Sequence, residues 1–192
     1  MLHSPSALQE RVDPRVKRTR NLILQAFSEL LTEKGFSEIT VQDIADRAEI
    51  NRATFYAHFP DKYALLQFSI EQAFRKELEK RTLSACHYSP QNLRALIVTV
   101  CEFIAGLNRY CKTRDAHFDS LVETKVREQV QGLIQLWLKE REGGEEIAVA
   151  TAWAIYGLAQ HWAHLKPRPH SEDYAEQVIP LISSLLSINA EV

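Results

Sequence analysis

The sequence has little of what secretion, membrane insertion or disulfide bonding would require. It contains three cysteines (Cys86, Cys101 and Cys111), an odd number without CxxC spacing, which indicates reduced thiols rather than a disulfide framework. No apolar run approaches the roughly 20 residues of a membrane-spanning helix, and the N-terminus lacks the apolar segment of a secretory signal. We therefore expect a cytoplasmic protein with no membrane partner.

The sequence motifs of catalysis and cofactor binding are also missing. There is no P-loop, no Gly-x-Ser-x-Gly, no His-Glu-x-x-His and no dinucleotide-binding glycine pattern, so we expect neither an enzyme nor a cofactor. His161 and His164 could share a metal ion, with Cys101 or Cys111 as a third ligand. Two histidines near a helix end more often bond carbonyls or line an interface, and no metal site is predicted.

The charge is close to balanced, with 23 Lys and Arg against 25 Asp and Glu, which argues against a protein that simply coats nucleic acid. A local basic excess occurs in residues 11–20, where Asp13 is the only acidic residue. Such a cluster is either the solvated start of a helix or a set of phosphate contacts. Its basic members are Arg11, Arg15, Lys17, Arg18 and Arg20.

Apolar residues at helical spacing are abundant, whereas strand-like alternation is absent. A chain of 192 residues is long enough for a substantial core, and we predict an all-α fold of about nine helices. After a mobile tail at residues 1–12, Asp13 and Pro14 mark the start of the first helix. Gly35 is predicted to end that helix in the left-handed conformation, with Phe36 folded back on its last turn.

Residues 40–62 are predicted to form two short helices joined by a tight turn, followed by the start of another helix. Thr40 is expected to cap the first short helix, with Asp43 as the acidic partner of a capping box. Asn51 is expected to cap the second. The pattern is that of a helix-turn-helix.

The second short helix has the residues expected of a recognition helix that enters a DNA groove. Phe55 and Phe59, one turn apart, can pin it against a core. The residues left on its other faces suit contacts to bases and phosphates. They are Arg52, Thr54, Tyr56 and His58.

A linking helix is predicted over residues 61–81, because Pro60 disfavours a helical residue before it and Asp61 can cap a new helix. Lys62 then lies in the first turn, where the helix dipole and free N–H groups favour a phosphate. The segment 82–91 is the expected domain boundary. Residues 90–192 show only helical patterns, including a last helix that Pro180 should kink.

Three short blocks of sequence carry a resemblance to a known family. They are TVQDIA from Thr40, TFYAHF from Thr54 and PDK from Pro60, and an amphipathic helix ending in Gly35 precedes them. The region from about Arg18 to Leu66 resembles the DNA-binding domain of TetR/AcrR-type bacterial transcriptional regulators. The resemblance covers roughly a quarter of the chain, and beyond it the likeness is architectural.

The resemblance implies a helix-turn-helix domain over residues 13–62 and a helical effector-binding and dimerisation domain over residues 90–192. It also implies which residues meet double-stranded DNA. The sequence departs from the family pattern at Asn51 and Ala53, so no preferred base sequence can be transferred. The expected DNA-contacting residues, including one from the basic cluster, are Gln42, Arg52, Ala53, Thr54, Tyr56, His58, Lys62 and Arg18.

Different roles are expected within this set. Arg52 is the side chain able to make a bidentate contact to guanine and hence to discriminate between bases. Tyr56 and Lys62 should add affinity that does not depend on sequence. The alternatives are that Tyr56 is a half-buried packing ring and that His58 bonds the helix end.

A single reading helix gives little specificity, so we expect a homodimer that binds a palindromic operator. The expected function is a ligand-responsive regulator, most often a repressor, released by a hydrophobic or aromatic effector; the alternative is a DNA-binding protein without effector control. For the pocket we predict Phe103, Leu107, Tyr110, Trp137, Trp153, Tyr156 and Trp162, with plain core packing as the alternative. For the dimer seam we predict Ala148, Ala152, Ile155, Ala159, Leu181, Leu185 and Ile188, with an intramolecular core as the alternative.

Overall fold

The computed structural model describes residues 13–81, 87–139 and 141–187, except for the side chains of residues 108–110 and 187. The expected tail at residues 1–12, the Tyr110 side chain and Ile188 therefore lie outside the described residues. The described residues form eight α-helices and one short 3-10 helix, and they contain no strand. The elements are α1 (Pro14–Glu33), η1 (Phe36–Glu38), α2 (Val41–Arg47), α3 (Arg52–His58), α4 (Lys62–Arg81), α5 (Pro90–Tyr110), α6 (Ala116–Trp137), α7 (Gly144–His164) and α8 (Ser171–Ser187). The all-α prediction is confirmed.

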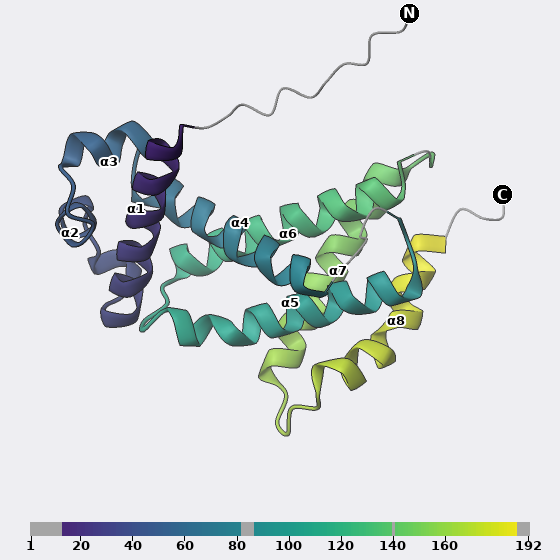
Figure 1. Cartoon of the computed structure of the whole chain (residues 1–192). Helices are drawn as coiled ribbons and strands as arrows, with labels where there is room; N and C mark the ends of the chain where they lie inside the picture. Colours follow the sequence, from purple (N-terminus) through teal and green to yellow (C-terminus); the bar gives the residue numbers. More distant parts are fainter. Residues whose placement is uncertain (1–12, 82–86, 140, 188–192) are drawn as a thin grey trace, which may run out of the picture.

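The first three helices form a unit at one end of the molecule (Figure 1). α1 begins as predicted, with Asp13 accepting a 2.8 Å hydrogen bond from the main-chain N–H of Arg15. α2 is held against the C-terminal half of α1 by ion pairs. Arg47 contacts Glu33 at 2.9 Å and Glu29 at 3.3 Å across the two helices. The exposed side chains of these ion pairs orient α2, while the buried apolar residues supply most of its stabilisation.

The predicted left-handed cap at Gly35 is wrong. Gly35 has φ −67° and ψ 153°, an extended conformation open to any residue, and α1 ends at Glu33 with Lys34 as its extended cap. The glycine instead lies at a close approach from another part of the chain. A Cβ atom at Gly35 would lie 3.3 Å from the Cβ of Thr113, which is in the loop between α5 and α6.

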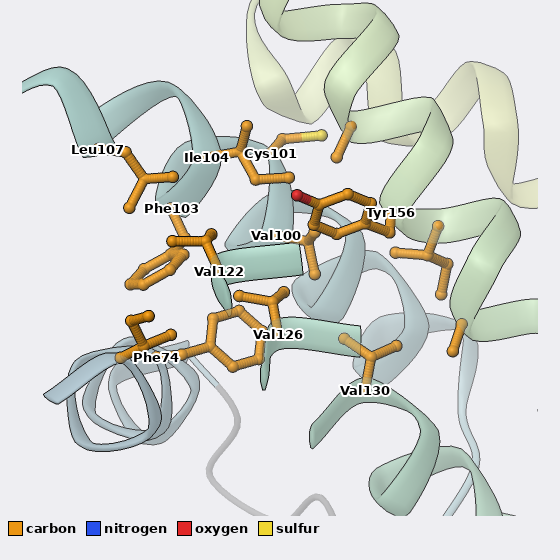
Figure 2. Packing of buried hydrophobic residues seen from close by; sticks show 14 of the residues in the cluster. Phe74, Val100, Cys101, Phe103, Ile104, Leu107, Val122, Val126, Val130 and Tyr156 are labelled. Carbon is orange, nitrogen blue, oxygen red and sulfur yellow. The ribbon is translucent and has the colours of Figure 1, made fainter. Parts of the chain in front are cut away.

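The body of the molecule is built from α4 to α8. α5 lies at its centre and packs against α4, α7 and α8, while α6 packs against α4 and α7 (Figure 1). Figure 2 shows Phe103 of α5 and Phe74 of α4 facing each other, with their ring centroids 5.1 Å apart. Val126 of α6 and Tyr156 of α7 lie on other sides of the same apolar cluster (Figure 2).

The buried residues form one continuous cluster that runs from Ile23 in α1 to Leu186 in α8. The two domains expected from the sequence therefore share a core through α4, whose Leu65 and Leu66 are buried near the first unit and whose Phe74 is buried in the body. α8 continues through Pro180 to Ser187. Within the described ranges, none of the helices has the length and apolar character needed to cross a membrane.

Candidate DNA interface

α3 is positioned by one polar cap and two buried rings, as the sequence predicted. The Asn51 side chain accepts hydrogen bonds from the main-chain N–H of Thr54 at 2.7 Å and from its hydroxyl at 2.9 Å. Phe55 and Phe59 are buried, with ring centroids 6.1 Å apart. A cap contributes about 1 kcal/mol, and two buried rings contribute several times that, so the orientation of this short helix is well determined.

The turn before α3 contains a feature that the sequence did not reveal. Glu49 has φ 54°, in the left-handed region that residues other than glycine seldom adopt. The turn is closed by main-chain hydrogen bonds from Ala48 to Ile44 at 2.9 Å and from Ile50 to Ala45 at 3.0 Å. These bonds hold α2 and α3 at a fixed angle.

Arg52 and Tyr56 form a pair on the exposed face of α3. Tyr56 is 47% exposed, with one ring contact to Phe55, and Arg52 is also exposed. A guanidinium N–H of Arg52 donates to the Tyr56 hydroxyl at 3.3 Å, and the guanidinium carbon lies 5.9 Å from the ring centroid. The pair presents a fork of donors beside a phenol, with the small side chains of Ala53 and Ala57 exposed next to it.

The remaining polar residues predicted on this surface differ in their exposure. Thr54 and His58 are half-buried, and burial together with the charge of Arg20 lowers the pKa of His58. His58 is therefore neutral at neutral pH and can offer a hydrogen bond rather than a charge. Gln42 is exposed and donates to Asp46 at 2.6 Å, and Arg18 is exposed on α1.

Arg20 is one of the five basic residues in segment 11–20, and the structure gives it a packing role. Its guanidinium lies over the rings of Phe68 at 5.0 Å and Phe59 at 5.5 Å. Its Nε is buried and has no hydrogen-bond partner in the described part of the chain. Arg20 thus joins α1 to the end of α3 and the start of α4. No motif marked it, because its partners lie far away in the sequence.

The contacts of Lys62 differ from the prediction of a free ammonium at a helix start. Its Nζ donates to three main-chain carbonyls, those of Ile39 at 2.8 Å, Phe36 at 3.1 Å and Ser37 at 3.2 Å. An ammonium has three donors, and all are engaged here. The first N–H groups of α4 are also occupied, because Asp61 accepts from Tyr63 and Ala64 at 2.8 Å. In this structure Lys62 fastens the start of α4 to η1.

The helix-turn-helix region matches a known sequence family. The profile described as "Bacterial regulatory proteins, tetR family" matches residues 23–67, which span α1 from Ile23, η1, α2, α3 and the start of α4. Residues 23–67 therefore bear the sequence signature of this family. The resemblance inferred from the sequence motifs is confirmed.

Relatives share part of the sequence, and solved structures share the fold. An uncharacterised helix-turn-helix regulator of Bacillus subtilis, YxbF, is 36% identical over 78 residues, 40% of this chain and 20% of the relative. The regulator EthR of Mycolicibacterium smegmatis is 31% identical over 118 residues, 60% of this chain and 54% of the relative. The chain thus spans less than two thirds of the length of each relative. A crystal structure of a TetR-family regulator from Streptomyces coelicolor A3 shares the fold, with a TM-score of 0.64, 19% identity, and coverage of 91% of this chain and 97% of that one.

The aromatic residues predicted for the effector pocket lie in different surroundings. Trp153 is exposed on the surface, with the guanidinium of Arg127 3.6 Å from its ring centroid. Trp162 donates to the carbonyl of Pro169, and Trp137 packs edge-on against Tyr88. Tyr156 is buried and bonded to Gln160 at 2.9 Å. These aromatic residues do not line a common cavity, because each contacts a different partner.

A cavity of about 530 Å³ lies elsewhere, between α4 and α5 and against α1 and the start of α6. We call it the α4–α5 cavity. Two predicted pocket residues, Phe103 and Leu107, do line it. Its other apolar walls are Leu31, Leu66, Ile70 and Phe118.

The residues predicted for the dimer seam differ in exposure between α7 and α8. Ala148, Ala152, Ile155 and Ala159 are all at most 1% exposed and pack inside their own chain. The same helix leaves Val149 and Trp153 exposed on another side. On α8, Leu181 is 54% exposed and Leu185 is half-buried.

The two histidines considered as metal ligands lie at the end of α7. His164 Nδ1 is 2.7 Å from the carbonyl of Gln160, and His161 is exposed. Within residues 13–81, 87–139 and 141–187, no three His, Cys, Asp or Glu side chains are grouped so that they could hold a metal ion. Cys101 and Cys111 are buried free thiols, and burial raises the pKa of Cys101 to about 12.

Proposed function

We propose that this chain is a DNA-binding transcriptional regulator that reads its operator through α3. The observation that carries the proposal is the Arg52–Tyr56 pair, exposed on a short helix that Phe55 and Phe59 fix from behind. An exposed guanidinium fork beside a phenol suits guanine and phosphate contacts in the major groove. Gln42, Ala53, Thr54, His58 and Arg18 are proposed as further contacts at the edges of this surface.

We propose that the regulator acts as a homodimer on a palindrome. A reading helix of two turns contacts only a few base pairs, and two copies spaced by about 34 Å or a multiple would read two half-sites. Helices α7 and α8 pack against each other. Their exposed apolar residues support a two-helix surface for pairing. These residues are Val149, Trp153 and Leu181.

The dimer surface is tested by adding a charge to it. Leu181→Glu and Trp153→Glu should convert a dimer into a monomer in sedimentation experiments at micromolar concentration. Leu22→Glu is the matched control, because Leu22 is 42% exposed but lies on α1. A wild-type protein that sediments only as a monomer contradicts the dimer.

We propose that a small molecule controls DNA binding by this regulator. This proposal is supported by the α4–α5 cavity, whose volume falls within the range of small-molecule sites. Two crystal structures with the same fold are described with ligands: FadR of Bacillus subtilis with stearoyl-CoA (TM-score 0.54, 14% identity) and RolR with resorcinol (0.55, 14%). The effector would act by its different affinities for the DNA-binding and released states.

We propose repression as the direction of control, because a dimer on a promoter blocks polymerase without further contacts. Relatives are named for both directions: one is a probable repressor of the acrEF/envCD operon, and DhaS is an activator. A transcription assay on the selected operator decides between them. Repression predicts less transcript when protein is added and recovery when effector is added.

The experiment that tests DNA reading is a selection from random duplexes with the purified protein. The expected result is an enriched palindrome that contains guanine in each half-site, where Arg52 would bind. Enrichment of no sequence would overturn specific regulation and favour the alternative, a DNA-binding protein without effector control. In that alternative, a thermal-shift screen would also find no small molecule that both stabilises the protein and releases DNA.

A further inference from the structure

The α4–α5 cavity has an apolar end and a charged end. Leu31, Leu66, Leu107 and Phe118 form the end next to the helix-turn-helix unit. Along α4 the lining continues at helical spacing through Ile70 to residues near the end of the helix. The charged lining residues are Lys76, Glu77, Lys80 and Glu102.

The cavity is long and has small residues along its walls. Leu66 and Lys80 are fourteen residues apart on one helix, which corresponds to roughly 21 Å at 1.5 Å per residue. Ser69 and Ala73 of α4 and Gly106 of α5 leave space between the two helices. These dimensions fit a single extended chain better than a compact ring.

The charges at the charged end of the α4–α5 cavity do not cancel. Glu77 pairs with Lys80 at 2.7 Å and with Arg81 at 3.4 Å, and Arg81 reaches Glu102 at 2.8 Å. The two carboxylates are thus matched by two cations, and Glu102 also accepts a hydrogen bond from Ser171 at 2.7 Å. Lys76 is exposed and forms no ion pair with any described residue. One ammonium at the mouth therefore remains for a ligand.

We propose that the α4–α5 cavity binds a single-chain amphiphile with one carboxylate, held with its headgroup at Lys76 and its chain directed toward Leu31 and Phe118. This assignment gives a site and a chemical class to the effector of the proposed function, on which it rests. A compound with several phosphates would need more unpaired cations than the single one at this mouth.

The far end of such a chain would touch the parts of the molecule that seat the helix-turn-helix unit. Ser28 and Leu31 belong to α1, Leu66 to the start of α4, and Phe118 to the start of α6. Phe118 also contacts Phe36, which follows α1, with ring centroids 6.3 Å apart. An occupant at this position separates α1 from α6, and the position of α3 changes with α1.

The test measures binding of straight-chain carboxylates to the full-length protein, with the alcohols of equal length as neutral probes. Dodecanoate should bind at least tenfold tighter than dodecanol. Affinity should rise about fourfold for each added methylene until the cavity is filled. Equal affinity for acid and alcohol, or no dependence on chain length, overturns the assignment.

Two variants locate the binding site. Lys76→Met keeps the apolar stem and should remove the tenfold preference for the acid, while Arg75→Met, an exposed residue of α4 that does not line the cavity, should leave it unchanged. Ala73→Phe fills the cavity and should abolish binding of both probes. An unchanged preference in Lys76→Met overturns the headgroup site even if Ala73→Phe does not fold.

DNA binding is measured separately on the selected operator, so the two proposals can fail independently. Loss of operator binding on adding dodecanoate to wild type, but not to Ala73→Phe, supports both. Operator binding without any response to the carboxylates overturns the amphiphile assignment and leaves the DNA-binding proposal standing. Carboxylate binding that depends on Lys76 in a protein that selects no operator overturns the proposed function alone.

Discussion

The main-chain N–H of Lys112 donates a 2.9 Å hydrogen bond to the carbonyl of Leu31. This bond joins the loop between α5 and α6 to the last turn of α1, whose final carbonyls have no partner within the helix. The same Leu31 lines the α4–α5 cavity with its side chain. Nearby, Tyr63 of α4 meets His117 of α6 edge-on, with ring centroids 4.8 Å apart. The helix-turn-helix unit is therefore seated on the body by a small set of close contacts.

Gly35 tests how tightly this joint is packed. Its backbone conformation accepts any side chain, so Gly35→Val acts only through space, where its Cβ would lie 3.3 Å from the Cβ of Thr113 and 3.4 Å from the Thr113 carbonyl. We expect a loss of about 1–3 kcal/mol in the free energy of unfolding, measured by urea titration.

The control for Gly35→Val is a glycine in open space. Gly132 lies inside α6 and a Cβ there would meet nothing within 4 Å, so Gly132→Ala should stabilise the protein by about 0.5–1 kcal/mol. Changes of opposite sign in the free energy of unfolding for the two glycine substitutions support the close approach of Thr113. A Gly35→Val protein as stable as wild type would show that the loop yields without cost.

Substitution of Lys62 distinguishes a structural role of this residue from a role as a phosphate contact. Its ammonium holds three carbonyls, and the burial that accompanies these bonds lowers its pKa. Lys62→Met keeps the stem and removes the donors, so we expect a loss of roughly 1.5–3 kcal/mol in the free energy of unfolding. Lys17→Met, on the exposed start of α1, should leave stability unchanged. If Lys62→Met weakens DNA binding with unfolding unaltered, the role expected from the sequence is the correct one.

The features that the sequence predicted well are those fixed by neighbouring residues. Thr40 and Asp43 form the predicted capping box, with the Asp43 carboxylate 2.7 Å from the Thr40 main-chain nitrogen. Asn51 and Asp13 cap the helices expected of them. Each of these contacts spans two or three residues, so its chemistry can be read from the sequence alone.

The features that the sequence did not predict depend on contacts with residues far away in the sequence. The small residues of α7 were correctly assigned to one apolar face, but periodicity does not say whether that face meets the same chain or a second copy. Ala152 and Ile155 are buried on α7, which packs against α5, α6 and α8 of its own chain, and Trp153 is exposed beside Arg127. The close approach of Thr113 to Gly35 and the carbonyl contacts of Lys62 were missed for the same reason, because the partners lie far away in sequence.

Arg52 is expected to determine base preference within the proposed interface. Arg52→Ala should reduce the difference between the selected operator and a scrambled duplex by about 1–3 kcal/mol, the value of a bidentate contact to guanine. Tyr56→Phe is the matched control: it removes the hydroxyl that accepts from Arg52 at 3.3 Å and keeps the ring. Fluorescence anisotropy on both duplexes gives the two affinities. Equal weakening on both by Arg52→Ala would place Arg52 on phosphates.

Asp43 should make the helix-turn-helix unit sensitive to acid. Hydrogen bonds from Thr40, then from Lys34, lower the pKa of Asp43 from 3.8 to about 2. Because the folded-state pKa lies below the unfolded one, the stabilisation is complete above about pH 4 and is lost as the pH falls toward 2. Asp43→Asn should lower the melting temperature at pH 7 and flatten its decline between pH 4 and pH 2. Asp46→Asn, on the same helix, removes a carboxylate bonded only to Gln42 among the described residues and should leave that decline intact. Parallel melting curves for wild type and Asp43→Asn through this range would show that another group controls acid unfolding.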